Sequence, residues 1–383
     1  PTCPGRAMSD AIKLQLFAGP AIPIPAPRAV IEALQEVKVE SGSGATQSGF
    51  ELTFEVSNRS PLHTLFLLTG GTSIPILRVV IALTVRGSTS VLMDGVMTHH
   101  EVRSASPGSS TLTIKGKDLT AVMDVVPLDG LPYPAMPPAL RVLTALAKYA
   151  ALGVAPMVIP SVYEDIPLPI DRIPRHQGTD YGYVSALAEA VGYVFYIDPG
   201  PLPGVSRAYW GPEIRLGVPQ KALSAGLPEP YANASNLQFR FDKEAKELPV
   251  VFIQEPYSKV PLLLPIPDIS PLNPPLGLVP PLPPKITFLN DTAKLNPIAA
   301  VMAGLAYASK HGDAVFGSGS LDVVRYGGVL RSRQLVTVRG AGEAFDGLHY
   351  VKSVTSTLKR GEFAQSFELA RNGLLSTLPV IPS

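Results

Sequence analysis

Hydrophobic and polar residues alternate most clearly over Gly49–Ser57, where one side of an extended chain carries Phe50, Leu52, Phe54 and Val56. Successive side chains of a strand point to opposite faces, so this pattern predicts one buried and one wet face. Shorter stretches with the same period recur along the chain, separated by Gly, Asp-Gly and Pro signals. Such a succession is typical of antiparallel β structure.

The first group of strands, residues 11–125, is predicted to form a small antiparallel β-barrel. Its other predicted strands are Ile12–Ala18, Val37–Glu40, Arg78–Arg86, Val91–Met93, Val96–Arg103 and Thr111–Lys115. Asp94-Gly95 is interpreted as a turn between two of them. Asp118 is a candidate cap for a helix over Leu119–Val125. Strands from 206–235 are candidates to complete this barrel.

Residues 126–205 change to a mixed pattern and are predicted to form an α/β connecting domain. One helix is expected over Ala139–Leu152, with an apolar stripe of Leu140, Leu143, Ala147 and Ala151. A second is expected over Thr179–Val191, ended by Gly192 and followed by a strand over Tyr193–Ile197.

Residues 236–373 are predicted to form a second β-barrel. Its last strands are Leu335–Arg339, Leu348–Val354 and Phe363–Leu369, with turns at Asp346-Gly347 and Gly361. A Pro-rich insertion, 256–285, is expected to be irregular with polyproline character, because proline cannot donate to a ladder. A helix over 293–310 is expected to bury Ile298, Val301, Met302 and Leu305. Residues 374–383 would be a C-terminal tail. The predicted fold class is thus mainly β with an α+β insert: two small antiparallel barrels joined by a mixed domain.

The composition narrows the class of protein. The 383 residues are 46% hydrophobic and only 16% charged, which indicates a globular chain of two or three domains. The net charge of +1 gives no footprint for nucleic acid or an anionic membrane. The single cysteine, Cys3, excludes an intrachain disulfide and suits assembly in the cytoplasm. Neither a secretory signal nor an apolar run long enough to span a membrane is visible, so direct membrane insertion is not expected.

A search for catalytic or metal-binding patterns gives none, so no catalytic, cofactor or metal residue is assigned. Glu164-Asp165 are adjacent in a Pro-rich loop, and His99-His100 point to opposite faces of a strand beside Glu101. Ser318 and Ser320 lack a Gly-x-Ser-x-Gly elbow. Gly340-Ala341-Gly342 lacks both a third glycine and a following helix. No enzymatic activity is therefore expected.

Three other features have ordinary explanations. Trp210, the only tryptophan, is interpreted as a packing anchor. Glycosylation-type tripeptides begin at Asn58, Asn233 and Asn290, but no secretory signal supports them. The Pro-rich segment could bind an SH3-type domain, yet its interleaved leucines favour a structural role.

One succession of residues near the C-terminus resembles a known family. It runs through Gly319, Leu321, Arg331-Ser332-Arg333, Val336-Thr337-Val338, Gly340, Asp346-Gly347, Tyr350-Val351, Val354, Gly361, Phe363, Phe367, Leu369 and Arg371-Asn372-Gly373. This order is similar to the C-terminal barrel of phage late control gene D proteins, the baseplate hubs of contractile phages and phage-like injection systems, and to the hub part of VgrG-type spikes. The segment YGYVSALAEAVGYVFYID also resembles a helix–Gly–strand unit of that family.

The resemblance implies a structural role. Such hubs form homotrimers whose six barrels adapt a hexameric inner tube to a trimeric spike. It implies an inner-tube partner, a separate spike protein and other baseplate proteins, because no spike domain follows the second barrel before Ser383. It also implies assembly in the bacterial cytoplasm as part of a phage-tail-like particle.

Two alternatives stay open from the sequence. A carbohydrate-active β-sandwich enzyme would need two convergent carboxylates, for which Glu51, Glu55, Glu164 and Asp165 are the candidates. A tail-tip adhesin would need exposed aromatic loops, and the sequence offers few.

Overall fold

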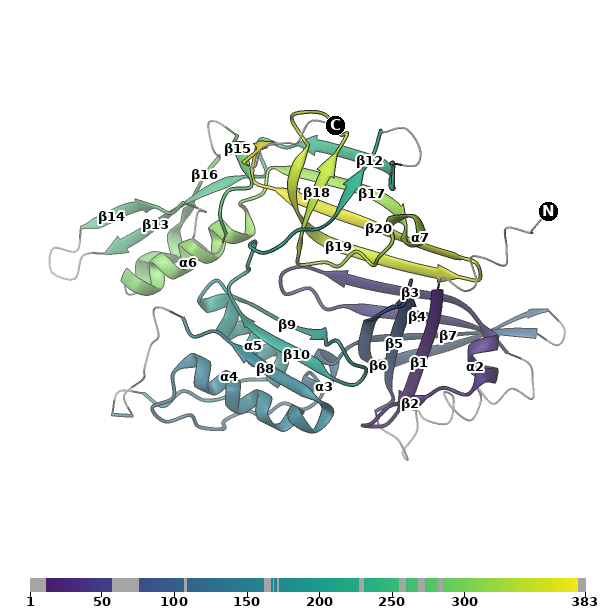
Figure 1. Ribbon diagram of the computed structural model, residues 1–383. Helices are drawn as coiled ribbons and strands as arrows, with labels where there is room; N and C mark the ends of the chain where they lie inside the picture. Colours follow the sequence, from purple (N-terminus) through teal and green to yellow (C-terminus); the bar gives the residue numbers. More distant parts are fainter. Residues whose placement is uncertain are drawn as a thin grey trace.

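A computed structural model describes residues 12–56, 76–106, 109–161, 167, 169–170, 172–226, 231–254, 260–267, 273–281, 285–295 and 297–377. Strands dominate this part of the chain, and one large sheet with antiparallel main pairings organises it (Figure 1). The prediction of a mainly β protein is confirmed.

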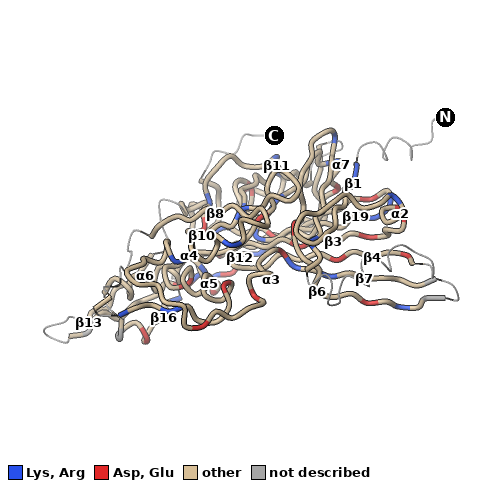
Figure 2. Tube along the Cα trace, turned by 90° about the horizontal axis from the view of Figure 1, so that it is seen from below, with Lys and Arg blue, Asp and Glu red and all other residues tan. Residues whose placement is uncertain are grey.

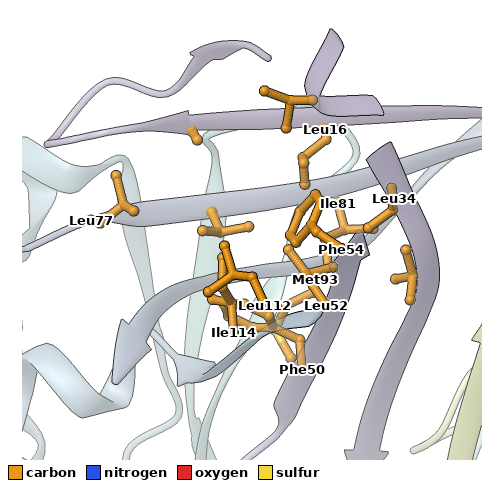
Figure 3. Packing of buried hydrophobic residues seen from close by; sticks show 14 of the residues in the cluster. Leu16, Leu34, Phe50, Leu52, Phe54, Leu77, Ile81, Met93, Leu112 and Ile114 are labelled. Atoms are coloured by element: carbon orange, nitrogen blue, oxygen red, sulfur yellow. The ribbon is translucent and has the colours of Figure 1, made fainter. Parts of the chain in front are cut away.

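The first half of the main sheet comes from the N-terminal part of the chain. Its strands are β1 (Ile12–Gly19), β2 (Ile24–Pro25), β3 (Leu34–Gly42), β4 (Gly49–Val56), β5 (Arg78–Val85), β6 (Ser88–Ser106) and β7 (Ser109–Asp118), with a short helix α2 (Arg28–Ala33). They run in the order β3-β4-β7-β6-β5-β1-β2 and curl around one apolar cluster. Leu16, Phe54, Ile81 and Ile114 meet there from four strands (Figure 3).

The second half contains β11 (Gln220–Ser224), β12 (Ala234–Phe241), β17 (Val315–Asp322), β18 (Leu335–Arg339), β19 (Gly347–Lys359) and β20 (Glu362–Arg371). A four-residue helix, α7 (Val323–Tyr326), follows β17. These strands curl around a second cluster that includes Phe363, Phe367 and Val338. Asp322 accepts a hydrogen bond from the Arg325 N–H and so caps α7.

The two halves are not separate barrels. β19 pairs with β3, so the main sheet runs without interruption from β12 to β2 and holds 13 strands. Among the described residues its path is open, and the prediction of two closed barrels is corrected to two curled halves of one sheet. To close the first barrel, β3 would have to pair with β1. β19 pairs with that edge of β3 instead, and so keeps the sheet open.

A smaller α/β unit lies beside the main sheet (Figure 1). Its sheet has the order β8-β10-β9, from β8 (Val154–Val158), β9 (Val194–Pro199) and β10 (Ser206–Gly211). The helices are α3 (Thr120–Met123), α4 (Pro138–Ala147), the 3₁₀ turn η2 (Lys148–Leu152) and α5 (Asp180–Ala190). The strands of 206–235 do not complete the first half, because β10 belongs to this sheet and β11 pairs with β18.

A projecting arm interrupts the second half between β12 and β17. It comprises β13 (Glu247–Gln254), β14 (Pro261–Pro265), β16 (Lys285–Leu289), η3 (Asn290–Lys294) and α6 (Pro297–Lys310). A two-stranded piece, β15 (Gly277–Val279) with β21 (Leu374–Ser376), lies near its base. The Pro-rich insertion therefore contains ladders, contrary to prediction. Pro261 and Pro265 stand at the two ends of β14, an edge strand in the described structure, where a missing donor does little harm.

Other expectations also need correction. Asp94-Gly95 is no turn, because β6 runs straight through it. Gly95 is required by close packing instead, since a Cβ there would lie 2.2 Å from the Lys117 carbonyl oxygen. The short helix expected over Leu119–Val125 is α3, but its N-cap is Leu119 and not Asp118, whose carboxylate accepts from the Thr120 N–H instead. On α4 the predicted stripe is wrong: Leu140 and Leu143 are exposed, and the buried face carries Ala139, Val142, Ala145 and Leu146. On α6 the predicted inward Ile298 is exposed.

Candidate functional site

The residues with possible chemistry lie apart from one another. Glu51 pairs with Lys115 at 3.4 Å, and Glu55 accepts a hydrogen bond from Gln35. Glu164 and Asp165 lie outside the described residues. Within the described part of the chain, no group of three or more His, Cys, Asp or Glu side chains could hold a metal ion. The geometry therefore brings no pair of candidate carboxylates together.

The remaining sequence candidates have structural positions. His99, His100 and Glu101 lie exposed on the outer part of β6, where Glu101 pairs with Arg103. Trp210 is fully buried and donates its indole N–H to the Val184 carbonyl, as expected of a packing anchor. Ser318 and Ser320 lie on β17, and the Ser320 hydroxyl contacts that of Ser235 at 3.1 Å.

Two further candidates belong to turns and strand ends. Gly340 and Gly342 have positive φ in the turn after β18, where the Ala341 N–H is bound by the Asp346 carboxylate. Asn233 uses its side-chain amide to bind the backbone of β11, which ties β12 to that strand. Asn290 begins η3, and Asn58 lies outside the described residues.

The feature that organises the molecule is a repeat of topology. In the first half, β3, β4, β5, β6 and β7 pair as β3-β4-β7-β6-β5, all antiparallel. In the second half, β12, β17, β18, β19 and β20 pair as β12-β17-β20-β19-β18, again all antiparallel. The strands correspond in chain order and in neighbours, so each half is a copy of the same five-strand plan, called here the β-unit.

The two β-units are joined by antiparallel pairing of neighbouring strands, as the strands within each unit are. β19 gives its first part to β18 and its second part, Ser353–Lys359, to β3. A bulge between Val351 and Ser353 separates the two parts. Its counterpart β6 gives its first part to β5 and has a bulge at the corresponding place, between Met97 and His99.

Two strand edges of this plan have no partner among the described residues. One is the outer edge of β12, which ends the main sheet. The other is the part of β6 beyond the bulge, which pairs only with β7 and is exposed on both faces. Unpaired edges expose rows of donors and acceptors that readily bind another strand. They lie at opposite ends of eight neighbouring strands, β12-β17-β20-β19-β3-β4-β7-β6.

One face of these eight strands is polar. On the second β-unit it carries short side chains, which include Ser318, Ser320, Ser353, Thr355 and Ser366. On the first, and at its junction with β19, it carries acids and bases, among them the pairs Glu36–Lys359, Lys38–Glu40 and Glu51–Lys115. Figure 2 shows acidic and basic positions interspersed along the trace of these strands. Interspersed charges of both signs keep this face hydrated and give it no strong electrostatic potential.

Buried ion pairs fix the linkers and the α/β unit against the β-units. Arg215, before β11, binds the Asp313 carboxylate with both guanidinium nitrogens and lies over the ring of Tyr350. Burial alone would raise the pKa of Asp313, but the Arg215 guanidinium holds it below its usual value. Arg333 binds Asp198 at 2.6 Å and stacks on Tyr196, which joins β9 to the second β-unit. Both pairs therefore anchor neighbouring segments to the second β-unit.

No model of a protein family matches the sequence, and no curated protein sequence matches it. Solved structures do match. A tail protein from Neisseria meningitidis is 12% identical with a TM-score of 0.61, covering 95% of this chain and 98% of its own. The 43 kDa tail protein of prophage MuSo2 from Shewanella oneidensis is 12% identical with a TM-score of 0.58, covering 94% and 98%.

A component of the type VI secretion system from Escherichia coli, c3393, is also similar. Its identity is 12% and its TM-score 0.53, and the match covers 91% of this chain and 77% of that one. That protein has structural similarity to the bacteriophage T4 tail proteins gp27 and gp5. At these identities the likeness establishes a shared fold over nearly the whole chain. The chain therefore has the fold of phage tail proteins.

Proposed function

We propose that this chain is a structural, non-enzymatic hub of a phage-tail-like contractile particle, and that three copies close into a ring of six β-units. The observation that carries the proposal is the repeated β-unit together with its internal junction, β19 on β3. A ring in which every junction is alike needs the same contact between chains, namely the outer part of β6 on β12 of the next copy. Heterologous contacts of this kind close into a ring when the rotation between neighbouring copies closes, here after three chains.

The internal junction supplies the register for this contact. It pairs Thr355 with Glu40 and Ser356 with Val39. Counting from the matching bulges, Glu101 corresponds to Thr355 and Val102 to Ser356. When β17 is aligned with β4, the strands beside them, β12 and β3, are aligned as well. Phe239 then corresponds to Val39, and Arg240 to Glu40. Glu101 would then face Arg240, and Val102 would face Phe239.

Both pairs are chemically matched. Glu101 and Arg240 have opposite charges, which favours this register over its neighbours. Val102 is 46% exposed in the single chain and would gain an aromatic partner. The bulky side of the eight strands, which carries both apolar clusters, fits the outer circumference of a ring. The polar face would then line its central channel.

The finer expectations of the family resemblance enter here as parts of the proposal. One side of the ring would meet the inner tube, and the other would meet a separate spike and further baseplate proteins. The particle would assemble in the bacterial cytoplasm. The described residues contain no helix that is long and apolar enough to cross a membrane.

Light scattering on the purified chain, alone and with the tube and spike proteins encoded beside it, tests the proposal. We expect a mass of three chains, reached alone or when the spike is added. Arg240→Glu should weaken association roughly tenfold, and the double variant Glu101→Arg, Arg240→Glu should recover most of it. Arg28→Glu, on exposed α2, serves as the control and should change nothing. A chain that stays monomeric with both proteins present would refute the ring.

A further inference from the structure

The two faces of the arm's sheet differ in chemistry. α6 covers the central strand on one face, where Val251 and Ile266 lie so close to Gly304 that a Cβ on it would fall 2.7 Å from each. Leu262 and Leu264, at the β14 edge of the same face, are exposed. The same face holds the Glu247 carboxylate, which accepts hydrogen bonds from Lys285, Thr287 and Tyr307, each at 2.6 Å. This network lowers the pKa of Glu247 to about 2. The arm is thus firmly built on its helical side.

The opposite face is entirely apolar among the described side chains. Register and alternation place there Leu248, Val250, Phe252, Leu263, Pro265, Ile286 and Phe288, called here the open face. Leu263, Ile286 and Phe288 are exposed by 57%, 55% and 53%. At its centre Val250 is buried, and Leu248 and Phe252 are half-buried, so the exposed part of the open face consists of Leu263, Pro265, Ile286 and Phe288. A sheet face of this kind is normally packed against another layer.

The area of the open face limits what can cover it. About half of three large side chains amounts to roughly 300 Å² of exposed apolar surface. A stable two-body interface needs about 800 Å² from each partner. The open face is therefore too small to hold a partner by itself, and it fits a molecule that is already bound elsewhere on the chain. In the proposed ring, the adjoining copy is such a molecule.

The same chain carries a second uncovered apolar surface. Ile22 and Ile24, between β1 and α2, and Leu202 and Val205, between β9 and β10, are exposed by 79%, 65%, 64% and 43%. We call these four residues the two-loop patch. Neither loop has a charged residue over 19–27 or 199–206. The patch thus resembles the open face in lacking charge.

A buried ion pair holds the two loops together. Arg78 donates to the Ala21 carbonyl at 3.1 Å and to the Gly204 carbonyl at 3.0 Å. The Asp94 carboxylate binds Arg78 with both oxygens and also accepts from the Ser206 hydroxyl. Burying an ion pair costs desolvation, so its placement under two exposed loops indicates that their positions matter. The patch is preorganised for contact.

We propose that the open face of the arm packs on the two-loop patch of the adjoining copy, an inference that rests on the ring proposed above. This contact is heterologous, so every copy gives one open face and one patch, and all are covered alike. Pairing of two open faces about a twofold axis would leave both patches exposed and would not build a threefold ring. Two uncharged aliphatic surfaces also match without leaving a charge buried.

Cysteine cross-linking tests the contact. In a Cys3→Ser background, Phe288→Cys and Leu202→Cys chains carrying different tags are co-expressed and treated with a short bismaleimide. We expect cross-linked pairs that contain one chain of each kind and few pairs when either variant is expressed alone. Val218→Cys, 93% exposed on a linker, replaces Leu202→Cys in the control and should give no product.

The outcomes separate the two proposals. A mass of three chains without a mixed cross-linked pair overturns the arm contact and leaves the ring standing, and so does cross-linking between two Phe288→Cys chains. A mass of one chain with no product overturns both. As a second measurement, Ile286→Glu should weaken association roughly tenfold, since about half of one large aliphatic side chain loses its apolar cover. Val218→Glu should not, and equal effects from the two would count against the contact.

Discussion

The two β-units share a plan but distribute volume differently within it. In the first, the row Val39–Phe50–Gly116 crosses three strands, with the Phe50 ring over the glycine. In the second, the corresponding row is Phe239–Gly317–Leu369, with the Phe239 ring over its glycine. The aromatic side chain has moved by one strand, and the glycine has moved with it. The plan therefore fixes the summed volume of a row and leaves the order of large and small side chains open.

The β-units differ more in what they add. Where the first turns tightly from β3 to β4, the second inserts the whole arm between β12 and β17. The sixth strand differs as well, since β1 pairs antiparallel with β5 while β11 pairs parallel with β18. The strands that differ are those outside the eight-strand stretch. This division supports the idea that the stretch itself serves an assembly with repeated contacts.

The largest effect is expected at the buried ion pairs. Asp94→Ala would leave Arg78 buried without a carboxylate and should lower the free energy of unfolding by about 3–5 kcal/mol. Asp313→Ala should cost less, about 2 kcal/mol, because Glu213 lies 3.4 Å from Arg215 and can take over the charge. Urea denaturation of both variants measures this difference. Equal losses would mean that Glu213 gives Arg215 no support.

A smaller effect is expected from mild acid at His349, in the second β-unit. His349 is fully buried, and burial together with the nearby Arg371 lowers its pKa from 6.5 to about 3. Between those values the unfolded chain binds a proton that the folded chain does not. The contribution of neutral His349 to the free energy of unfolding is thus complete above pH 6.5. It falls by about 1.4 kcal/mol for each pH unit below that value, until about pH 3.

Denaturation at pH 7.5 and pH 5.0 checks this sign. The natural chain should lose about 2 kcal/mol more than His349→Gln over that interval. His100→Gln, on exposed β6, is the matched control and should behave like the natural chain. A His349→Gln variant that lost as much as the natural chain would place the acid sensitivity elsewhere.

The smallest effect sharpens the glycine comparison. A Cβ on Gly116 would lie 2.3 Å from the Phe50 ring and 2.4 Å from the Val96 carbonyl oxygen, so backbone must move. The three atoms nearest to a Cβ on Gly317 all belong to the Phe239 ring, a side chain on an edge strand that can shift more readily than backbone. Gly116→Ala should cost about 1–2 kcal/mol and Gly317→Ala less than about 1 kcal/mol. Thermal denaturation of the two variants measures this difference. A larger loss of stability in Gly317→Ala than in Gly116→Ala would contradict the prediction.

Local patterns predicted the strands well where one face is buried. Gly49–Val56 and Leu335–Arg339 were expected from alternation, and their buried positions are those predicted. The pattern failed at Asp94-Gly95, because a carboxylate neutralised by Arg78 inside a sheet looks like a turn residue in the sequence. It failed on α4 because the face of Ala139, Val142, Ala145 and Leu146 meets the core, while Leu140 and Leu143 stay exposed.

The candidate assembly surface could not be predicted from the same patterns. Alternation tells which face of a strand is buried but carries no information about which strand lies beside it. β3 and β19 are more than 300 positions apart in the sequence, so no local signal links them. The residues alone do not reveal the duplication, since equivalent rows such as Val39–Phe50–Gly116 and Phe239–Gly317–Leu369 have no identical residue at equivalent positions. The order of strand pairing reveals it.

The junction of β19 with β3 also sets a timetable for biosynthesis. β3 leaves the ribosome more than 300 residues before its partner on β19, which follows about 15–60 s later at ordinary rates of synthesis. During that interval one side of β3 is open to strands of other nascent chains. A truncated chain that lacks residues 353–359 can never satisfy that edge, so the pairing of β19 acts as a proofreading step. Only chains translated beyond residue 359 can complete the main sheet.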